Sequence, residues 1–385
     1  MNTIQDFKDY VSSVESTPGY KKPVAFGLGI RKKKEETTLE VFYPHINYGT
    51  AYGTAAVIHA ATNYGKYESG YEIISKAALE QALEKFKPFE NDGKDHPNID
   101  LIRTLSEAPQ DLNTYHETDI ICYFMYETDK GVDSPEEGYF KTQCLSQLHV
   151  KPHDLDCSGI FGKMNNIAWT NKGPILPKDL ASEKVKWTFR GEELVVSHVD
   201  KFPYMVNFHV PAGVRIVQGS KVRLGAHLSP GTTVMPAGFV NFNAGTLGSA
   251  MIEGRVSAGV VVGNKTDIGG GASIMGTLSG GNKNVISIGE QCLLGANAGT
   301  GISLGNGCTI AAGVYVTAAA KVSLYNDNKE PINLEGEVVA EGDNIVKGSE
   351  LNGKEYILYI QDSQSAKIIA RPNTKVIELN ESLHG

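Results

Sequence analysis

The chain lacks long apolar runs and an excess of basic residues. Its 385 residues carry 36 Lys and Arg against 44 Asp and Glu, a formal net charge of −8, which argues against nonspecific binding of nucleic acid. No apolar stretch reaches membrane-spanning length, and the N-terminus lacks a basic segment followed by an apolar one. These absences predict a soluble cytoplasmic protein that binds neither nucleic acid nor membrane.

Cysteine and histidine are also scarce. The five cysteines are odd in number and form no Cys-x-x-Cys pair, so we expect reduced thiols rather than disulfides or a zinc ribbon. Only His209 and His227 lie in or near the glycine-rich part of the chain. A zinc site usually needs a third protein ligand, and the sequence offers none at a suitable spacing. We therefore expect no bound metal.

Glycine, by contrast, recurs every six residues in three stretches: Gly213, Gly219, Gly225 and Gly231; Gly263 and Gly269; Gly289, Gly295, Gly301, Gly307 and Gly313. In the outer two stretches, a side chain suited to burial stands three residues after each glycine: Ile216, Val222, Leu228 and Val234; Cys292, Ala298, Leu304, Ile310 and Val316. Neither a helix nor a simple strand has this period. It is the hexapeptide period of a parallel β-helix.

Three such hexads make one triangular coil, in which short strands turn one apolar residue inward and glycines favour the corners. At three hexads per coil, Pro211 to Val322 leaves room for about six coils. The alternative is a flexible glycine-rich segment, but such a segment would not keep apolar residues in register through so many hexads.

Two stretches, Val240 to Val256 and Ile274 to Ile286, break the period. We expect both to be loops or distorted corners thrown out from the rigid coil, where sites commonly lie. The first stretch carries Glu253, whose carboxylate could accept a proton from an amine or attack an activated acyl carbon. It could equally be a solvated surface glutamate. The Gly269-Gly-Gly271 turn before the second stretch could let a ligand approach the backbone, or could only turn a corner.

Three domains are predicted. Residues 1–205 lack the six-residue period and read as an α/β domain, with helices near 4–14, 74–83 and 99–105 and strands near 38–43, 119–125 and 193–198. Residues 206–325 form the coil. Residues 326–385 form a small β cap with a hairpin near 356–360 and 367–371, since an open coil end would expose a sheet edge. The fold class is thus mainly β.

Long blocks of the sequence resemble the tetrahydrodipicolinate N-succinyltransferase family, in its longer, actinobacterial-type branch. They are more specific than the hexapeptide pattern and cover roughly residues 145 to 385, with the main blocks at 199–206, 222–235, 238–248, 269–281 and 292–297. The resemblance implies a left-handed parallel β-helix, despite the general right-handed preference for crossovers. It also implies a homotrimer with active sites in the grooves between subunits.

The reaction implied by the resemblance is transfer of a succinyl group from the co-substrate succinyl-CoA to the amino group of L-2-amino-6-oxopimelate. This compound is the ring-opened form of tetrahydrodipicolinate in the diaminopimelate and lysine pathway. No cofactor would be bound permanently. Glu253 matches the catalytic glutamate of the family, either as a general base or as a nucleophile that forms an acyl anhydride. Backbone N–H groups near Gly270 are candidates to stabilise the oxyanion.

Eight positions match those where the family contacts succinyl-CoA: Arg255, Gly270, Ser273, Ala296, Ala311, Ala312, Ala319 and Lys347. Arg255 would pair with the succinyl carboxylate. Ala311 and Ala319 differ from the common side chains at their positions, so only backbone contacts would remain there. Some relatives hold magnesium with acidic residues where this chain has Ser220 and Ala237, which again predicts no metal.

Two other functions stay open on the sequence. One is a hexapeptide acetyltransferase that acts on another amine or hydroxyl acceptor. The other is a noncatalytic β-helix scaffold, which would not bind coenzyme A.

Overall fold

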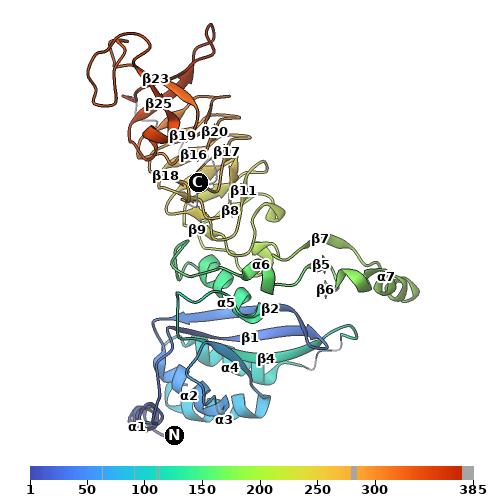
Figure 1. The fold of residues 1–385 in the computed structure, drawn as a ribbon. Helices are drawn as coiled ribbons and strands as arrows, with labels where there is room; N and C mark the ends of the chain where they lie inside the picture. The colour runs from blue at the N-terminus through green and yellow to red at the C-terminus, as the bar shows by residue number, and fades with distance from the viewer. Residues whose placement is uncertain (63, 91, 110, 112, 279–283, 375–385) are drawn as a thin grey trace. The chain divides into compact units, whose positions relative to one another are not determined.

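The structure, a computed structural model, describes residues 1–62, 64–90, 92–109, 111, 113–278 and 284–374 (Figure 1). The chain forms two compact units. Unit 1 comprises Met1–Cys144 and Asp154–Pro203, and unit 2 comprises Leu145–His153 and the chain from Tyr204 onward. The short segment Leu145–His153 was not set apart by the sequence analysis. The predicted domain boundaries at residues 205 and 326 stay predictions.

Unit 1 is built on an antiparallel sheet of order β2-β1-β4-β3. Its strands are β1 (Ala25–Lys34), β2 (Thr37–Tyr48), β3 (Gly70–Ile73) and β4 (Glu117–Met125). Its helices are α1 (Ile4–Glu15), α2 (Tyr52–Thr62), α3 (Lys76–Phe86), the 3-10 turn η1 (Lys87–Phe89), α4 (Pro97–Glu107) and α5 (Pro135–Ser146). Figure 1 shows α2, α3 and α4 on one face of the sheet and α5 on the other.

The three helices and two of the strands predicted for this sheet region are confirmed as α1, α3, α4, β2 and β4. Helix α2 was missed because its sequence, Tyr-Gly-Thr-Ala-Ala-Val-Ile-His-Ala-Ala-Thr, is apolar on nearly every side and its middle residues are all buried. A helix without a polar face has no 3.6-residue pattern for sequence analysis to find. Strand β1 was missed although it lies at the centre of the sheet, between β2 and β4.

A second, three-stranded antiparallel sheet of order β6-β5-β7 completes unit 1. The elements are α6 (Ile160–Lys163), β5 (Ile167–Thr170), β6 (Gly173–Ile175), η2 (Pro177–Asp179), α7 (Leu180–Phe189) and β7 (Val196–Asp200). The strand predicted near 193–198 is therefore present, but it begins later.

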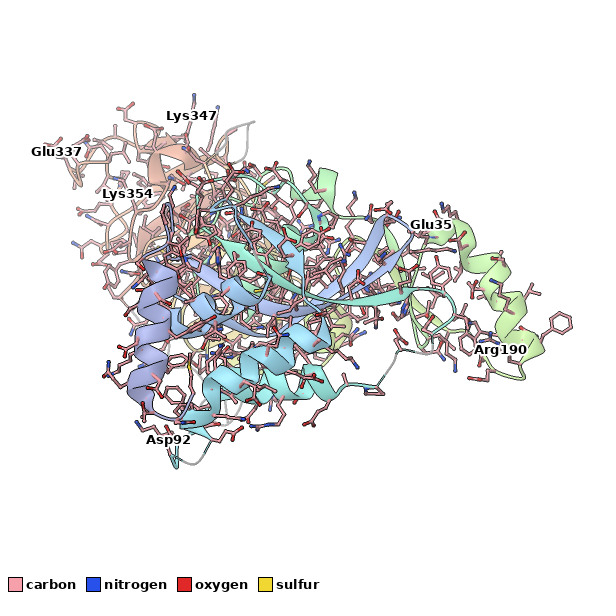
Figure 2. The ribbon with its side chains drawn as sticks, turned by 90° about the horizontal axis from the view of Figure 1, so that it is seen from below. Glu35, Asp92, Arg190, Glu337, Lys347 and Lys354 are labelled. Carbon is pink, nitrogen blue, oxygen red and sulfur yellow. The ribbon has the colours of Figure 1, made fainter. Side chains whose placement is uncertain are left out.

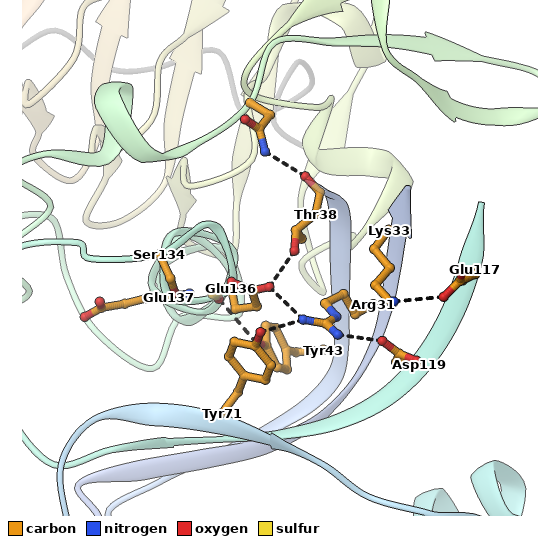
Figure 3. Close-up of polar contacts among 11 residues, drawn as sticks. Arg31, Lys33, Thr38, Tyr43, Tyr71, Glu117, Asp119, Ser134, Glu136 and Glu137 are labelled. Atoms are coloured by element: carbon orange, nitrogen blue, oxygen red, sulfur yellow. Dashed lines mark hydrogen bonds and ion pairs between the residues drawn. The ribbon is translucent and has the colours of Figure 1, made fainter. Parts of the chain in front are cut away.

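A buried ion network ties the first sheet of unit 1 to α5. Arg31 on β1 is 6% exposed, and its guanidinium donates to the Tyr71 hydroxyl at 2.6 Å, to Asp119 at 2.5 Å and to Glu136 at 3.2 Å. The hydroxyl of Thr38 donates to the same Glu136 oxygen at 2.5 Å. Figure 3 shows the contacts of Tyr71, Asp119 and Glu136 converging on the guanidinium, and Thr38 bonded to Glu136. Because each charge has a partner, removal of any one of them would leave a buried charge uncompensated between α5 and the sheet.

Unit 2 is a three-sided coil, and successive strands of its chain belong in turn to three parallel sheets. We name them side 1, side 2 and side 3. Side 1 contains β8 (Arg215–Ile216), β10 (Thr232–Val234), β13 (Ala250–Ile252), β16 (Thr266–Ile268), β19 (Leu293–Leu294) and β21 (Thr309–Ile310). Side 2 contains β11 (Phe239–Val240), β14 (Arg255–Val256), β17 (Ser273–Ile274), β20 (Gly299–Thr300) and β22 (Tyr315–Val316). Side 3 contains β9 (His227–Leu228), β12 (Gly245–Thr246), β15 (Val261–Val262) and β18 (Ser287–Ile288). The 3-10 turn η3 (Met205–Asn207) precedes these strands, and η4 (Gly219–Lys221) lies between β8 and β9.

The inward positions predicted from the period are confirmed. Each of them is buried, except that Ile216 in the first coil is half-buried. The five cysteines are free thiols, and Cys292 and Cys308 are buried at inward positions as expected. The hexapeptide pattern thus marks the residues that fill the coil.

The first predicted interruption is not a projecting loop, so that part of the prediction is wrong. Strands β12, β13 and β14 continue the three sheets through it in register. What changes is one corner: Val256 follows Ile252 by four positions, whereas the paired residues of the next coil, Ile274 and Ile268, lie six apart. Glu253 and Gly254 therefore form a shortened corner within an otherwise regular coil.

The second interruption is an excursion, as predicted. Thr277 and Val285 form an antiparallel bridge, and the Leu278 N–H donates to the Asn284 carbonyl at 2.9 Å. Residues 279–283 between them lie outside the described residues. The chain then rejoins side 3 at β18.

The predicted terminal hairpin is confirmed. Strands β25 (Ile357–Gln361) and β26 (Ile368–Pro372) pair antiparallel, and β25 pairs parallel with β21, so the hairpin extends side 1. The remaining elements are β23 (Lys321–Leu324), β24 (Ile345–Lys347) and η5 (Gly348–Leu351). The edge left by the last coil on this side is thereby covered. No helix within the described ranges has the length and hydropathy needed to cross a bilayer.

Candidate active site

Four of the predicted site residues lie in one column, at the corner between side 1 and side 2. The Gly271 N–H donates to the Glu253 carbonyl at 3.3 Å, and the Asn297 N–H donates to the Gly270 carbonyl at 2.9 Å. One coil further, the Gly313 N–H donates to the Ala296 carbonyl at 2.9 Å. Residues far apart in the sequence are thus stacked. We call this set the corner column: Glu253, Gly270, Ala296 and Ala312.

The shortened corner holds Glu253 tightly by its backbone. The Glu253 N–H donates to the Ile268 carbonyl at 2.8 Å, and the Arg255 N–H donates to the Ala272 carbonyl at 2.7 Å. Between them, a Cβ on Gly254 would lie 2.5 Å from the Ala272 carbonyl oxygen. Only glycine leaves room for the two coils to approach so closely at this corner.

The Glu253 carboxylate lies against Gly270 of the next coil. A Cβ on Gly270 would be 3.5 Å from Oε2 of Glu253, and the Glu253 side chain is half-buried. Within the described residues, the structure records no hydrogen bond or ion pair for this carboxylate and no acceptor for the Gly270 N–H. A proton acceptor and a backbone donor therefore lie side by side at the corner, and both have capacity for a ligand.

Arg255 and Ser273 are brought together on the outer face of side 2. They are paired residues of adjacent parallel strands, and a guanidinium nitrogen of Arg255 donates to the Ser273 hydroxyl at 2.5 Å. Arg255 is exposed and, among the described residues, has no ion pair. The guanidinium is therefore positively charged, accessible and only two residues from Glu253.

Ala311 precedes Ala312 in the corner column, whereas Ala319 and Lys347 lie apart from it. Ala319 is in the turn after β22, and Lys347 ends β24, where it is exposed (Figure 2). The Ser349 N–H donates to the Ala318 carbonyl at 2.9 Å, so the two segments run side by side. These two residues belong to the C-terminal end of the coil.

The corner column and its extension present small side chains to solvent. Ala296, Ala312 and Ala319 are all exposed. A row of alanines on a rigid coil leaves space for a long, thin ligand beside the backbone. Within the described ranges, no group of three or more His, Cys, Asp or Glu side chains is arranged to hold a metal ion.

Two further residues of the outer face of side 2 were not predicted from the sequence, Gly299 on β20 and Tyr315 on β22. Both continue the line of Arg255 and Ser273 across side 2. The period marks inward positions, and these residues stand one position before such residues, Thr300 and Val316. The pairing of successive strands places them in this line, but this pairing cannot be worked out from the sequence unless the length of the excursion after β17 is known.

Three family models match the chain. The N-terminal model of tetrahydrodipicolinate N-succinyltransferase matches residues 5–162, and the middle model of the same family matches residues 164–204. A model of the hexapeptide repeat of succinyl-transferase matches residues 285–318. The sequence blocks that resemble the family begin near residue 145, whereas the N-terminal model begins at residue 5, so the similarity extends much further toward the N-terminus.

Similar proteins agree with these models. A Vibrio cholerae 2,3,4,5-tetrahydropyridine-2,6-dicarboxylate N-succinyltransferase is 51% identical over 257 residues, which are 67% of this chain and 72% of that protein. The Pseudomonas putida protein of the same name is 41% identical over 94% of this chain and 97% of its own length.

A crystal structure from Campylobacter jejuni, described as a candidate 2,3,4,5-tetrahydropyridine-2-carboxylate N-succinyltransferase, has a TM-score of 0.87 and 36% identity. The match covers 98% of this chain and 99% of that one. None of these three organisms is an actinobacterium, so placement in an actinobacterial-type branch stays a prediction. Matches over almost the whole length, together with the family models, show that the chain belongs to the tetrahydrodipicolinate N-succinyltransferase family.

Proposed function

We propose that the protein transfers the succinyl group of succinyl-CoA to the amino group of L-2-amino-6-oxopimelate, the open form of tetrahydrodipicolinate. The products are N-succinyl-2-amino-6-oxopimelate and CoA. Family membership supports the reaction class. The main observation in support of the site is that the Glu253 carboxylate lies against Gly270, two residues before Arg255, which has no ion pair among the described residues.

Glu253 acts as the general base in this proposal. The substrate amine attacks the thioester carbonyl, a C–N bond forms, and the amine proton moves to the Glu253 carboxylate. The tetrahedral oxyanion is stabilised by the Gly270 N–H, which has no other recorded acceptor among the described residues. The C–S bond then breaks, and the proton held by Glu253 passes to the departing CoA thiolate.

The covalent route through an acyl anhydride on Glu253 is the alternative for the same residue. An amine is already a competent nucleophile once it has lost a proton, so the direct route needs fewer steps. Incubation with succinyl-CoA alone, followed by mass spectrometry of the intact protein, separates the two. A mass increase of one succinyl group that Glu253→Gln abolishes would favour the anhydride.

The pantetheine arm of the co-substrate would lie along the exposed alanines of the corner column, toward Ala319 and Lys347. Ala296 and Ala312 offer backbone groups and no bulk, and Ala311 and Ala319 would contribute only backbone contacts. Lys347 is an exposed cation at the end of this path, suited to a phosphate group.

The proposal also includes a left-handed parallel β-helix, a homotrimer with sites between subunits, and a cytoplasmic location for this biosynthetic step. The hexapeptide match and the parallel three-sided coil support the helix. The trimer rests on the family resemblance. Light scattering after size-exclusion chromatography tests it, and a monomer at working concentration would refute it.

The central test is release of CoA thiol from succinyl-CoA in the presence of tetrahydrodipicolinate. The wild type should be active, and Glu253→Gln should lose at least about a hundredfold in kcat, since a positioned base contributes roughly that much or more. Glu290→Gln is the matched control, because Glu290 is an exposed glutamate of unit 2 outside the corner column.

Each negative result in these assays would overturn a different part of the proposal. No CoA release by the wild type would overturn the proposed reaction, and activity with acetyl-CoA and a sugar or serine acceptor would identify another hexapeptide acyltransferase. A protein that bound no coenzyme A thioester would be a scaffold. Near-normal kcat in Glu253→Gln would remove Glu253 from the chemistry.

A further inference from the structure

Five residues form one line across the outer face of side 2. The strand register places Phe239, Arg255, Ser273, Gly299 and Tyr315 opposite one another on successive strands. The next residue on each strand points inward, and all five of those residues are completely buried: Val240, Val256, Ile274, Thr300 and Val316. Because side chains alternate along a strand, the five residues of the line share the outer face. We call them the outer row.

The Tyr315 ring lies directly on Gly299. A Cβ on Gly299 would be 2.1 Å from Cε2 and 2.6 Å from Cζ of Tyr315. The backbone of Gly299 is outside the left-handed region, so glycine is required here for space and not for its conformational freedom. Tyr315 is nevertheless 40% exposed. Gly299 therefore leaves the space that this exposed aromatic ring occupies, and we call this space the seat of Tyr315.

This seat brings the phenol toward Arg255. The Tyr315 oxygen is bonded to Cζ, so it lies over β20, one strand from Ser273. From the other side, the Arg255 guanidinium reaches the Ser273 hydroxyl at 2.5 Å. A guanidinium, a serine hydroxyl and a phenol thus occupy the outer row between β14 and β20, within roughly 10 Å at the usual strand spacing.

These groups are suited to an anion. All three can donate hydrogen bonds, and among the described residues Arg255 has no carboxylate partner. A planar carboxylate can accept two N–H bonds from a guanidinium and further bonds from hydroxyl groups. The base Glu253 is two residues from Arg255, so a carboxylate held by this trio lies close to the reacting centre.

We propose that Tyr315, seated on Gly299, is a specificity-determining residue whose hydroxyl donates to the terminal carboxylate of the transferred acyl group, beside Arg255 and Ser273. The inference rests on the proposed succinyl transfer and deepens it. A carboxylate of the amino-acid acceptor has the same chemistry, so the experiment must separate the two sources. An acyl group without a terminal carboxylate, such as acetyl, gains nothing from the trio.

The test compares Tyr315→Phe with the wild type. The variant keeps the ring on Gly299 and removes only the hydroxyl. The affinity for succinyl-CoA, measured by calorimetry, should fall about tenfold, as expected for loss of a hydrogen bond to a charged group. The affinity for acetyl-CoA should not change. In turnover, KM for succinyl-CoA should rise while KM for tetrahydrodipicolinate stays constant.

Tyr356→Phe is the matched control. Tyr356 is also an exposed tyrosine of unit 2 seated on a glycine, since a Cβ on Gly307 would lie 2.5 Å from its ring, but it is outside the outer row. It should leave both affinities unchanged. Gly299→Ala should displace the Tyr315 ring and reproduce the loss in succinyl-CoA affinity with Tyr315 intact.

An unchanged ratio of succinyl-CoA to acetyl-CoA affinity in Tyr315→Phe would overturn the inference. A selective rise in KM for tetrahydrodipicolinate would overturn it as well, by assigning the trio to the acceptor. Because binding is measured without turnover, the outcome is separate from that of the proposed function. An inactive wild type that still preferred succinyl-CoA through Tyr315 would refute the reaction and uphold the inference.

Discussion

The carboxylate of Glu253 and the backbone of Gly270 meet across two successive coils, with Oε2 3.5 Å from the position that a Cβ on Gly270 would occupy. The corner at Glu253 is two residues shorter than the corner of the next coil, which contains Gly270. The shorter corner carries the glutamate, and the longer one carries the glycine turn.

Gly270→Ala is expected to reduce activity with little effect on folding. The backbone there is outside the left-handed region, and the new methyl group would meet Glu253 at ordinary van der Waals distance. It would occupy space beside the carboxylate and its substrate. Thermal unfolding should show a nearly unchanged Tm, while the CoA-release assay shows reduced kcat.

Gly254→Ala is the counterpart of Gly270→Ala and should mainly reduce the stability of the fold. A Cβ there would be 2.5 Å from a backbone carbonyl oxygen, so the two coils must separate. We expect about 1–3 kcal/mol of destabilisation, as for other overpacked sites. Equal Tm values for the two variants would contradict this reading of the corner.

Arg255→Ala should weaken the preference for succinyl-CoA over acetyl-CoA, because it removes a guanidinium that has no carboxylate partner in the described part of the chain. Arg255→Lys should restore only part of it, since an ammonium group cannot bind a carboxylate with two parallel N–H bonds. The measurement is the ratio of kcat/KM for the two thioesters. If that ratio is the same in Arg255→Ala and wild type, Arg255 does not contact the acyl group.

Arg31→Met should destabilise unit 1 strongly. It leaves the buried Glu136 without its cation, and breaking a buried pair in this way costs about 3–5 kcal/mol. Urea unfolding measures the free energy. Lys33→Met on the same strand is the control, because the Lys33 pair with Glu117 lies at the surface and should contribute little. Similar unfolding midpoints for the two variants would show that the network in Figure 3 is not stabilising.

His59 should make the protein less stable in mild acid. Burial lowers the pKa of this imidazole, so the unfolded chain takes up a proton more readily than the folded one. Stability is then complete above the unfolded pKa of about 6.5 and decreases as the pH falls below it. The drop in Tm between pH 7.5 and 5.5 should be smaller in His59→Phe than in wild type. Parallel pH profiles would exclude His59 as a cause.

Much of the coil followed from local sequence. A six-residue period with an apolar residue at a constant offset leaves few ways to bury those side chains, so the inward positions and the three-sided arrangement could be predicted. The terminal hairpin followed from two apolar stretches joined by a polar segment. Helix α2 could not be found in this way, because a uniformly apolar segment has no periodic face.

Part of the candidate site could likewise be predicted from the sequence, and part could not. Glu253 could be singled out from the sequence because of its chemistry and the local break in the period, whereas the role expected of Arg255 came from the family resemblance. Their neighbours could not be derived, because alignment across coils depends on the length of every corner between them. The four-position step at Glu253 and the excursion after β17 shift each later residue. Only the folded coil decided that Gly270 lies against Glu253 and that Gly299 gives Tyr315 its seat, because the hydrogen bonds between successive coils set that register.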